Sequence, residues 1–383
     1  MKLLATLGCL TGAALVGCAA LPTAGPTAKE VVKQEVGRHR RRFDLVDINR
    51  HVVGVLSAQP KASFYERFGN EGKPPPAPIG IGDAVAVTIW EAAPGGLFAA
   101  ANPAAGGAQG IRIPVQTVGP DGGISVPYAG RVPAAGRLPV EVQQEIERRL
   151  SGKAIEPQVI VTVAKTVTDT ATVSGEVVRG ARLPLSLNGE RLLDLIAAAG
   201  GARSPIYETF VKLSRGGVTV TIPMERLVSY PAENIYAWPG DVLTLVRVPQ
   251  SFTAFGATGR NAEVAFEAER LSLVEAIAKS GGLLDQRSDP RGVFLFRYEP
   301  GPIIEALHAR DLKTGPRGSS PVVYRLDMRR ADAYFLARRF PVENKDILYV
   351  ANAPLTEIQK FFTLLNTLTG PVLTGIIVNK SAP

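Results

Sequence analysis

The chain has 383 residues, of which 45% are hydrophobic and 20% are charged. These proportions are ordinary for a globular protein, and the length allows two to four domains. The 43 Lys and Arg against 35 Asp and Glu give a formal net charge of +8. The one basic cluster, Arg38–Arg42, could touch nucleic acid or anionic lipid. It lacks interleaved aromatic residues, so a solvated segment is favoured and no nucleic-acid partner is expected.

Residues 1–17 have the pattern of a secretory signal peptide. Lys2 precedes an almost wholly apolar run, Leu3–Val16, which is too short to span a bilayer comfortably. The run ends in Leu-Val-Gly followed by Cys18, which resembles the bacterial lipobox, where the cysteine carries diacylglycerol and becomes the first mature residue. We therefore predict a covalent lipid on Cys18 and no other cofactor. A plain cleavage site beside a chance cysteine is the alternative.

The residues around this cysteine also bear on location and chemistry. Cys9 lies within the signal peptide, so the mature chain has no free thiol, which excludes disulfides and cysteine catalysis. Lipoproteins kept in the inner membrane commonly carry Asp after the cysteine, so Ala19 fits sorting to the outer membrane. Residues 18–78 are interpreted as a lipidated tether and linker, with a strand at Leu45–Leu56 and a stiff Pro-rich end.

Residues 79–169 are predicted to form the first folded domain. Ala84–Trp90 has the β-branched composition of a strand. Residues 92–110 are rich in Gly and Ala and are interpreted as a long loop. Val118–Tyr128 predicts a strand, a tight Asp-Gly turn and a second strand. Pro139–Leu150 has apolar residues at a spacing of four and predicts an amphipathic helix.

A repeat with a constant offset of 81 residues follows this domain. It predicts two tandem modules, residues 170–249 and 250–352, each with a helix packed on a sheet. In both modules a Gly-Gly pair is expected to end the helix with a left-handed cap. The matching segments are Thr172–Glu176 with Thr253–Ala257, and Leu192–Gly201 (LLDLIAAAGG) with Leu273–Gly282 (LVEAIAKSGG).

These parts, in this order, resemble the Wza-type polysaccharide export lipoproteins. The Ile-Gly-Asp ending at Asp83, the segment Asp121–Gly130 (DGGISVPYAG) and the segment Glu156–Val163 (EPQVIVTV) are similar to the polysaccharide biosynthesis/export domain. The two modules look like SLBB domains. The second module departs from that pattern, because Asn-Lys precedes Asp346 where Pro-Gly is usual.

The resemblance implies an α+β fold with a β-rich export domain over residues 79–169, two tandem β-grasp-like (SLBB) modules, and a C-terminal amphipathic membrane helix forming an oligomeric α-barrel. It also implies a homo-oligomeric ring anchored by lipid in the outer membrane, with its bulk in the periplasm. The partners implied are an inner-membrane polysaccharide copolymerase, outer-membrane lipid and the polysaccharide itself.

Residues that could support catalysis or metal binding are sparse. His39, His51 and His308 are far apart and have no ligand partner at zinc spacing, so no metal site is expected. The residues that could be offered as glycosidase carboxylates each lie beside a glycine or before a strand, where Asp commonly bonds its own backbone. We therefore predict that the protein is not an enzyme. The carboxylates concerned are Asp83, Asp121, Asp241 and Asp346.

Residues 353–383 form the last predicted element, an amphipathic transmembrane helix and tail. Residues 355–378 would span about 36 Å as a helix, enough to cross about 30 Å of hydrocarbon, and Gly370-Pro371 predicts a kink. Placed at 100° per residue, the side chains divide into two faces. The lipid-facing residues are expected to be Ile358, Phe361, Phe362, Leu365, Leu368, Val372 and Ile376. The pore-lining residues are expected to be Thr356, Gln359, Lys360, Thr363, Asn366, Thr367 and Thr374.

A single helix with such a polar face would be costly in lipid, whereas a ring of copies would turn the polar faces to a water-filled lumen. About eight helices would leave a lumen near 15 Å. The alternative for this segment is a helix docked on the protein's own sheet. The function predicted is an outer-membrane export channel for capsule or exopolysaccharide. The alternative is a monomeric periplasmic glycan-binding lipoprotein without a pore, and an enzyme acting on glycan lacks a catalytic constellation.

Overall fold

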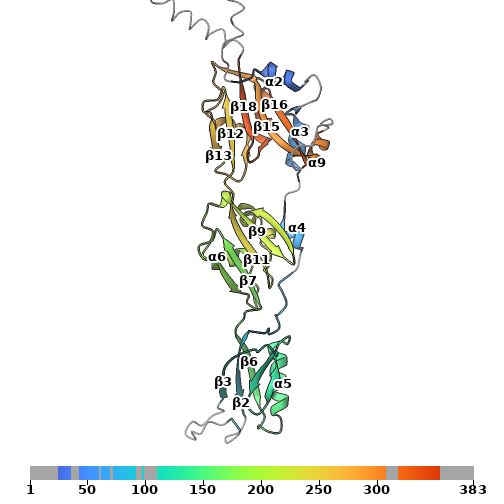
Figure 1. Ribbon diagram of the computed structural model, residues 1–383, viewed down its shortest axis with the longest axis vertical. Coiled ribbons are helices and arrows are strands. Elements are labelled where there is room, and N and C mark those ends of the chain that lie inside the picture. The colour runs from blue at the N-terminus through green and yellow to red at the C-terminus, as the bar shows by residue number, and fades with distance from the viewer. Residues whose placement is uncertain are drawn as a thin grey trace, which may run out of the picture. The chain divides into compact units, whose positions relative to one another are not determined.

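The computed structural model describes residues 25–35, 43–59, 62–69, 72–91, 97–98, 110–307 and 318–353. The chain divides into two compact units. One unit contains residues 61–248, and the other contains the residues before 61 together with those from 249 onward. Figure 1 labels helices and strands from both units where there is room.

The 79–169 domain is built on a three-stranded antiparallel sheet with a helix against it. Its elements are β2 (Ala84–Trp90), β3 (Gly110–Thr117), β4 (Gly123–Val126), β5 (Gly130–Pro133), α5 (Pro139–Leu150) and β6 (Gln158–Lys165). β2 lies at the centre of the sheet, between β3 and β6. The helix spans the predicted residues, and Val142, Ile146 and Leu150 are fully buried at the predicted spacing of four. This burial is what holds the helix, because its own residues have no strong apolar excess outside that stripe.

The strands on the two sides of the Asp-Gly turn do not pair with each other. β4 pairs with β5, whereas β3 pairs with β2, so residues 118–122 connect two different sheets and do not close a hairpin. The carboxylate of Asp121 accepts a hydrogen bond from Arg131 Nε of β5 at 2.7 Å. An Asp-Gly turn therefore reverses the chain here without selecting the preceding strand as partner. Local periodicity identifies strands but not their partners.

The first module is a five-stranded sheet with the order β10-β9-β11-β7-β8. β11 runs parallel to β7, and the remaining neighbours are antiparallel. Its elements are β7 (Thr170–Gly175), β8 (Ala181–Pro184), α6 (Leu192–Ala198), β9 (Thr209–Arg215), β10 (Val218–Pro223), α7 (Met224–Ser229) and β11 (Val242–Arg247), with short 3-10 turns at Ile206–Glu208 and Pro231–Glu233. A short helix from earlier in the chain, α4 (Phe64–Phe68), buries Phe64 in the core of this module.

The second module repeats this topology strand for strand. The strand order β16-β15-β18-β12-β13 corresponds to β10-β9-β11-β7-β8, with the parallel pair now formed by β12 and β18. Its elements are β12 (Ser251–Gly256), β13 (Ala262–Ala265), β14 (Leu271–Ser272), α8 (Leu273–Lys279), β15 (Ser288–Pro300), α9 (Gly301–Ala306), β16 (Ser319–Leu326), α10 (Ala331–Arg339), β17 (Pro341–Val342) and β18 (Ile347–Asn352). The repeat in the sequence is therefore a repeat of structure, with α6 and α8 in equivalent places.

Two structural requirements explain why glycines recur at equivalent positions of the two modules. Gly175 and Gly256 have φ of 86° and 93°, and a Cβ on either would lie 2.0 Å from a carbonyl oxygen of the neighbouring parallel strand. No side chain fits at that approach. The helices end as predicted: the N–H groups of Gly201 and Gly282 both donate over 2.9 Å to a carbonyl five residues earlier, which is the left-handed cap.

Residues 25–59 differ from the tether that the sequence predicted for residues 18–78. They contribute α2 (Ala28–Glu35), β1 (Asp44–Asp47) and α3 (Arg50–Ser57) to the unit that holds the second module. β1 adds to the edge of its sheet, parallel to β16. The strand expected over Leu45–Leu56 is thus a short strand followed by a helix. The helix forms because Asn49 caps it, with Oδ1 accepting the N–H of Val52 at 3.0 Å.

Among the helices that the structure describes, none is long and apolar enough to cross a membrane. The predicted membrane segment over residues 355–378 lies outside the described residues, as does the predicted signal peptide. The fold shown is therefore a mixed α/β chain of β-rich modules.

Candidate functional site

The structure describes some of the site residues considered in the sequence analysis but not others. Cys18 and every pore-lining and lipid-facing residue predicted after residue 353 lie outside the described residues. The four aspartates considered as possible catalytic carboxylates are all described.

Three of the four aspartates occupy the same kind of turn before a strand. In each, the carboxylate accepts a hydrogen bond from the backbone N–H three residues earlier, which is the pattern of an Asp that closes its own turn. The turn interpretation of these residues is confirmed. The pairs and distances are Asp83 with Gly80 at 2.8 Å, Asp241 with Trp238 at 2.9 Å, and Asp346 with Glu343 at 2.7 Å.

An arginine completes the turn in each module. Arg215 donates to both carboxylate oxygens of Asp241 at 2.9 and 2.7 Å, and Arg297 donates to both oxygens of Asp346 at 2.9 and 2.6 Å. Each arginine also donates to a backbone carbonyl in the same turn. The sequence analysis identified the aspartates and missed the arginines, because the two partners are separated by 26 residues in one module and 49 in the other.

The ion pair of Arg297 and Asp346 in the second module is more deeply buried than the equivalent pair in the first module. The side chains of Arg297, Asp346 and Glu299 are 4%, 1% and 1% exposed. The hydroxyl of Tyr324 donates to Glu299 at 2.7 Å, and burial together with this carboxylate raises the pKa of Tyr324, which stays protonated. Burial alone would lower the pKa of Arg297, but the hydrogen bonds and charge of Asp346 raise it. These groups hold the module together and leave no carboxylate free for catalysis here.

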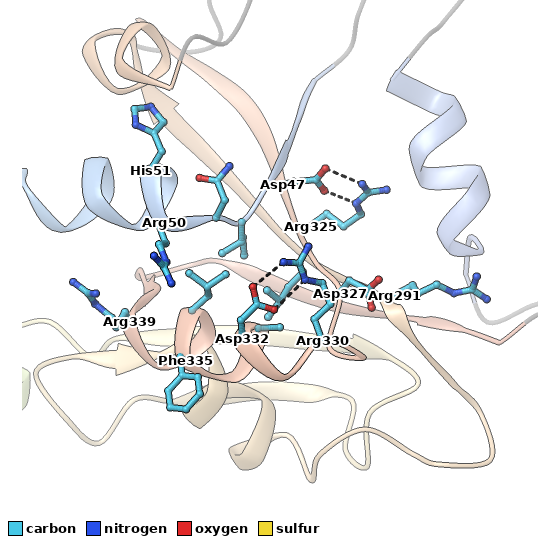
Figure 2. Close-up of a pocket in the computed structure, with 15 residues that line it drawn as sticks. Asp47, Arg50, His51, Arg291, Arg325, Asp327, Arg330, Asp332, Phe335 and Arg339 are labelled. Atoms are coloured by element: carbon cyan, nitrogen blue, oxygen red, sulfur yellow. Dashed lines mark hydrogen bonds and ion pairs between the residues drawn. The ribbon is translucent and has the colours of Figure 1, made fainter.

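A hollow of about 1100 Å³ lies in the same unit, between β1, α3, the end of β16 and α10. Its wall carries five arginines and three aspartates (Figure 2). The arginines come from separate elements: Arg50 from the start of α3, Arg291 and Arg325 from β15 and β16, Arg330 from the residue before α10, and Arg339 from the last residue of α10. The sequence analysis did not find this cluster, since its members are spread over almost 300 positions.

The aspartates of the hollow are already neutralised by arginines. Asp47 receives two hydrogen bonds from Arg325 at 2.6 and 2.8 Å, and Asp332 receives two from Arg330 at 3.0 and 2.8 Å. The hydrogen bond from Arg330 lowers the pKa of Asp332, and the nearby charge of Arg50 adds to the effect. The third aspartate, Asp327, is paired with an arginine outside the hollow. The uncompensated charge is therefore positive.

Two arginines carry most of that excess charge. Within the described part of the chain, neither Arg50 nor Arg339 has a carboxylate within ion-pair distance. Both are exposed, and both line the hollow. The planar guanidinium group suits bidentate contacts with phosphate or carboxylate oxygens. The arrangement is able to hold an anionic group.

The hollow lies at one particular end of the second module's sheet. Val293 of β15 pairs with Leu326 of β16 on one side and with Val350 of β18 on the other. Leu326, which lines the hollow, is therefore level with Val350, near the last described residue, Ala353. The hollow thus opens at the end of the sheet from which the chain continues into residues 354–383.

Comparison with protein-family models gives three matches. Residues 71–164 match the family described as polysaccharide biosynthesis/export protein, and residues 170–223 and 250–350 each match the SLBB domain. The capsule polysaccharide export outer membrane protein CtrA of Neisseria meningitidis serogroup B is 41% identical over 379 residues, covering 96% of this chain and 94% of its own length.

The chain belongs to the polysaccharide export family.

Other members are similar over most of the chain. The capsule polysaccharide export protein BexD of Haemophilus influenzae is 36% identical over 94% of this chain and 93% of its own length. The EPS I polysaccharide export outer membrane protein EpsA of Ralstonia solanacearum is 26% identical over 80% of each chain. The family expected from the order of motifs is therefore confirmed, including the two SLBB modules.

Proposed function

We propose that this protein is a subunit of a homo-oligomeric channel that exports polysaccharide through the outer membrane. Its relatives are named as capsule polysaccharide export outer membrane proteins, which supports both the cargo and the location. The relatives are named as export proteins, and export is not a chemical reaction. One observation on this chain carries the proposal further: its two candidate membrane elements leave the same unit at the same place.

Residues near the start of the described chain contact residues near its end. The hydroxyl of Tyr349 in β18 donates to the carbonyl of Pro26 at 2.6 Å. A Cβ at Gly292 would lie 2.8 Å from the Cβ atoms of both Ala28 and Ala351. The segment that leads back to the lipidated cysteine therefore lies against the strand that leads forward to residues 354–383.

This proximity restricts where the two elements insert. Six residues lie between Cys18 and Gly25, and the seven steps of an extended chain reach at most about 25 Å. The acyl chains on Cys18, each CH₂ contributing about 0.8 kcal/mol, and a helix beginning near Leu355 would therefore enter the same membrane. This short reach supports the proposal that the anchor and the pore belong to one membrane.

The pore itself rests on the two faces of residues 355–378. In a ring of about eight copies, Phe362 and Leu365 would face lipid, and Thr363 and Thr367 would face the lumen. Hydroxyl and amide side chains exchange hydrogen bonds with a hydrated glycan without holding it by charge. An inner-membrane copolymerase would deliver the polymer to the periplasmic modules.

The assembly is tested by extracting the full-length protein in mild detergent and imaging single particles. Closed rings of identical subunits are the result expected. Monomeric particles at every detergent and protein concentration would favour the alternative function, a periplasmic glycan-binding lipoprotein without a pore. A crosslinking experiment on intact cells before extraction excludes dissociation by detergent as the cause.

The lipid anchor gives a separate prediction. Cys18→Ser removes the thiol that carries diacylglycerol, so incorporation of radiolabelled palmitate should fall to background and the protein should leave the outer-membrane fraction. Cys9→Ser is the matched control, because Cys9 lies within the signal peptide and its loss should leave labelling unchanged. Labelling that persists in the Cys18 variant would contradict the assignment.

A further inference from the structure

We propose that the arginine-lined hollow binds the phosphate of an anionic phospholipid headgroup at the periplasmic face of the outer membrane. The proposal rests on the proposed function, because it requires the unit holding the second module to lie at the membrane. The ligand class is a phosphate diester with acyl chains attached, and the two guanidinium groups that would bind it are those of Arg50 and Arg339.

The charge balance of the hollow supports an anionic ligand. Asp47 and Asp332 are each satisfied by a two-point contact with an arginine, so they do not compete for the remaining cations. Arg50 and Arg339 lie on the left of the hollow in Figure 2 and have no ion-pair partner within the described residues. A phosphate diester offers two charged oxygens to such a pair.

The position of the hollow supports a lipid as the source of that phosphate. Leu326, in its wall, lies two strand spacings, or about 10 Å, from Val350 in the same sheet. Leu355 follows Ala353 by two residues, a reach of at most about 7 Å. If residues from Leu355 onward enter the bilayer, the hollow lies near the headgroup layer, which is several ångströms thick on each side.

The lipid side is favoured over the lumen by the neighbours of the hollow. Arg291 in its wall precedes Gly292, which lies against Ala28 of the segment leading to Cys18. An acyl anchor must be in lipid and cannot be in a water-filled lumen. Phe335, also in the wall, is 74% exposed. An exposed aromatic ring beside cationic groups suits a membrane interface, where the ring meets acyl chains and the charges meet phosphate.

The test measures headgroup binding by the full-length protein in uncharged detergent. Dihexanoyl phosphatidylglycerol is titrated below its micelle concentration and followed by calorimetry. Dihexanoyl phosphatidylcholine, inorganic phosphate and a carboxylated oligosaccharide such as oligogalacturonate are the comparison ligands. We expect phosphatidylglycerol to bind most tightly, and the double variant R50Q/R339Q to raise its Kd about tenfold or more.

The matched control is R270Q/R338Q, which removes the same charge from exposed residues of the same unit that do not line the hollow. Its Kd should stay within about twofold of the unmodified protein's, since only long-range charge is lost. None of the four arginines is buried, so both variants should keep the thermal unfolding midpoint of the parent.

Several outcomes would overturn the proposal. The first two are an unchanged Kd for phosphatidylglycerol in R50Q/R339Q and an equal loss of affinity in the control variant. The third is tighter binding of oligogalacturonate than of phosphatidylglycerol. The fourth is equally tight binding of inorganic phosphate, which would indicate a non-specific anion site. Loss of headgroup binding with rings intact would reject this site alone. Headgroup binding without rings would reject the channel alone.

Discussion

Replacing Arg297 by methionine should destabilise the second SLBB module by about 3–5 kcal/mol. The substitution keeps the apolar stem and removes the only guanidinium that the structure places between Asp346 and Glu299, whose side chains are each 1% exposed. Both carboxylates would then be buried without a cation. The loss of one partner from a buried ion pair costs more than the pair contributes, because the remaining charge cannot be solvated.

The unfolding of the two units can be followed separately. Both tryptophans, Trp90 and Trp238, lie in the unit of residues 61–248, so tryptophan fluorescence reports on that unit alone. In denaturant, R297M should lower the midpoint of the circular dichroism transition, which reports on both units, and leave the fluorescence transition in place. Limited proteolysis should locate the early cleavage within residues 249–353.

The equivalent substitution in the first module, R215M, is the matched control. Arg215 is 14% exposed and its partner Asp241 is 1% exposed, so water can partly replace the lost cation and the effect should be smaller. The change should now appear in the fluorescence transition, since the backbone N–H of Trp238 donates to Asp241. A neutral result for R297M would mean that the second module does not depend on its buried pair.

Replacing Phe362 by aspartate should abolish export of polysaccharide. Phe362 is expected on the lipid face of the C-terminal helix, where a charge costs about 2.5–3.5 kcal/mol per helix. A ring of identical subunits multiplies that cost by the number of copies. Surface polysaccharide should therefore disappear in cells that have this variant as their only copy, while the periplasmic modules remain folded and resistant to protease.

The controls use the other face of the same helix. T363C should react with a small membrane-impermeant maleimide through the lumen. Its thiol would be the one free thiol of the mature chain if Cys18 carries the proposed lipid. F362C, about 100° away on the apolar face, should react poorly because a thiol in hydrocarbon stays protonated. Equal labelling at both positions, or normal export with Asp at both 362 and 365, would mean that this helix does not line a pore.

Local pattern was sufficient for the features that depend on neighbouring residues. The spacing of Val142, Ile146 and Leu150 predicted α5 with its bounds, because a helix needs only one apolar stripe to pack on a sheet. The repeat at an offset of 81 predicted that α6 and α8 have equivalent places. The Gly-Gly caps were predictable because that backbone conformation favours glycine over residues that carry a Cβ atom.

The sequence by itself thus determined the family, the tandem modules and the aspartate turns, all of which are encoded within short windows. Only the tertiary structure decided which strands pair, that β1 joins β16, and that Arg297 neutralises Asp346 from 49 residues away. It alone assembled Arg50 and Arg339 into one hollow. The physical reason is that ion pairs and sheet edges depend on distances in space, and no periodicity of the chain records which distant residues the fold brings together.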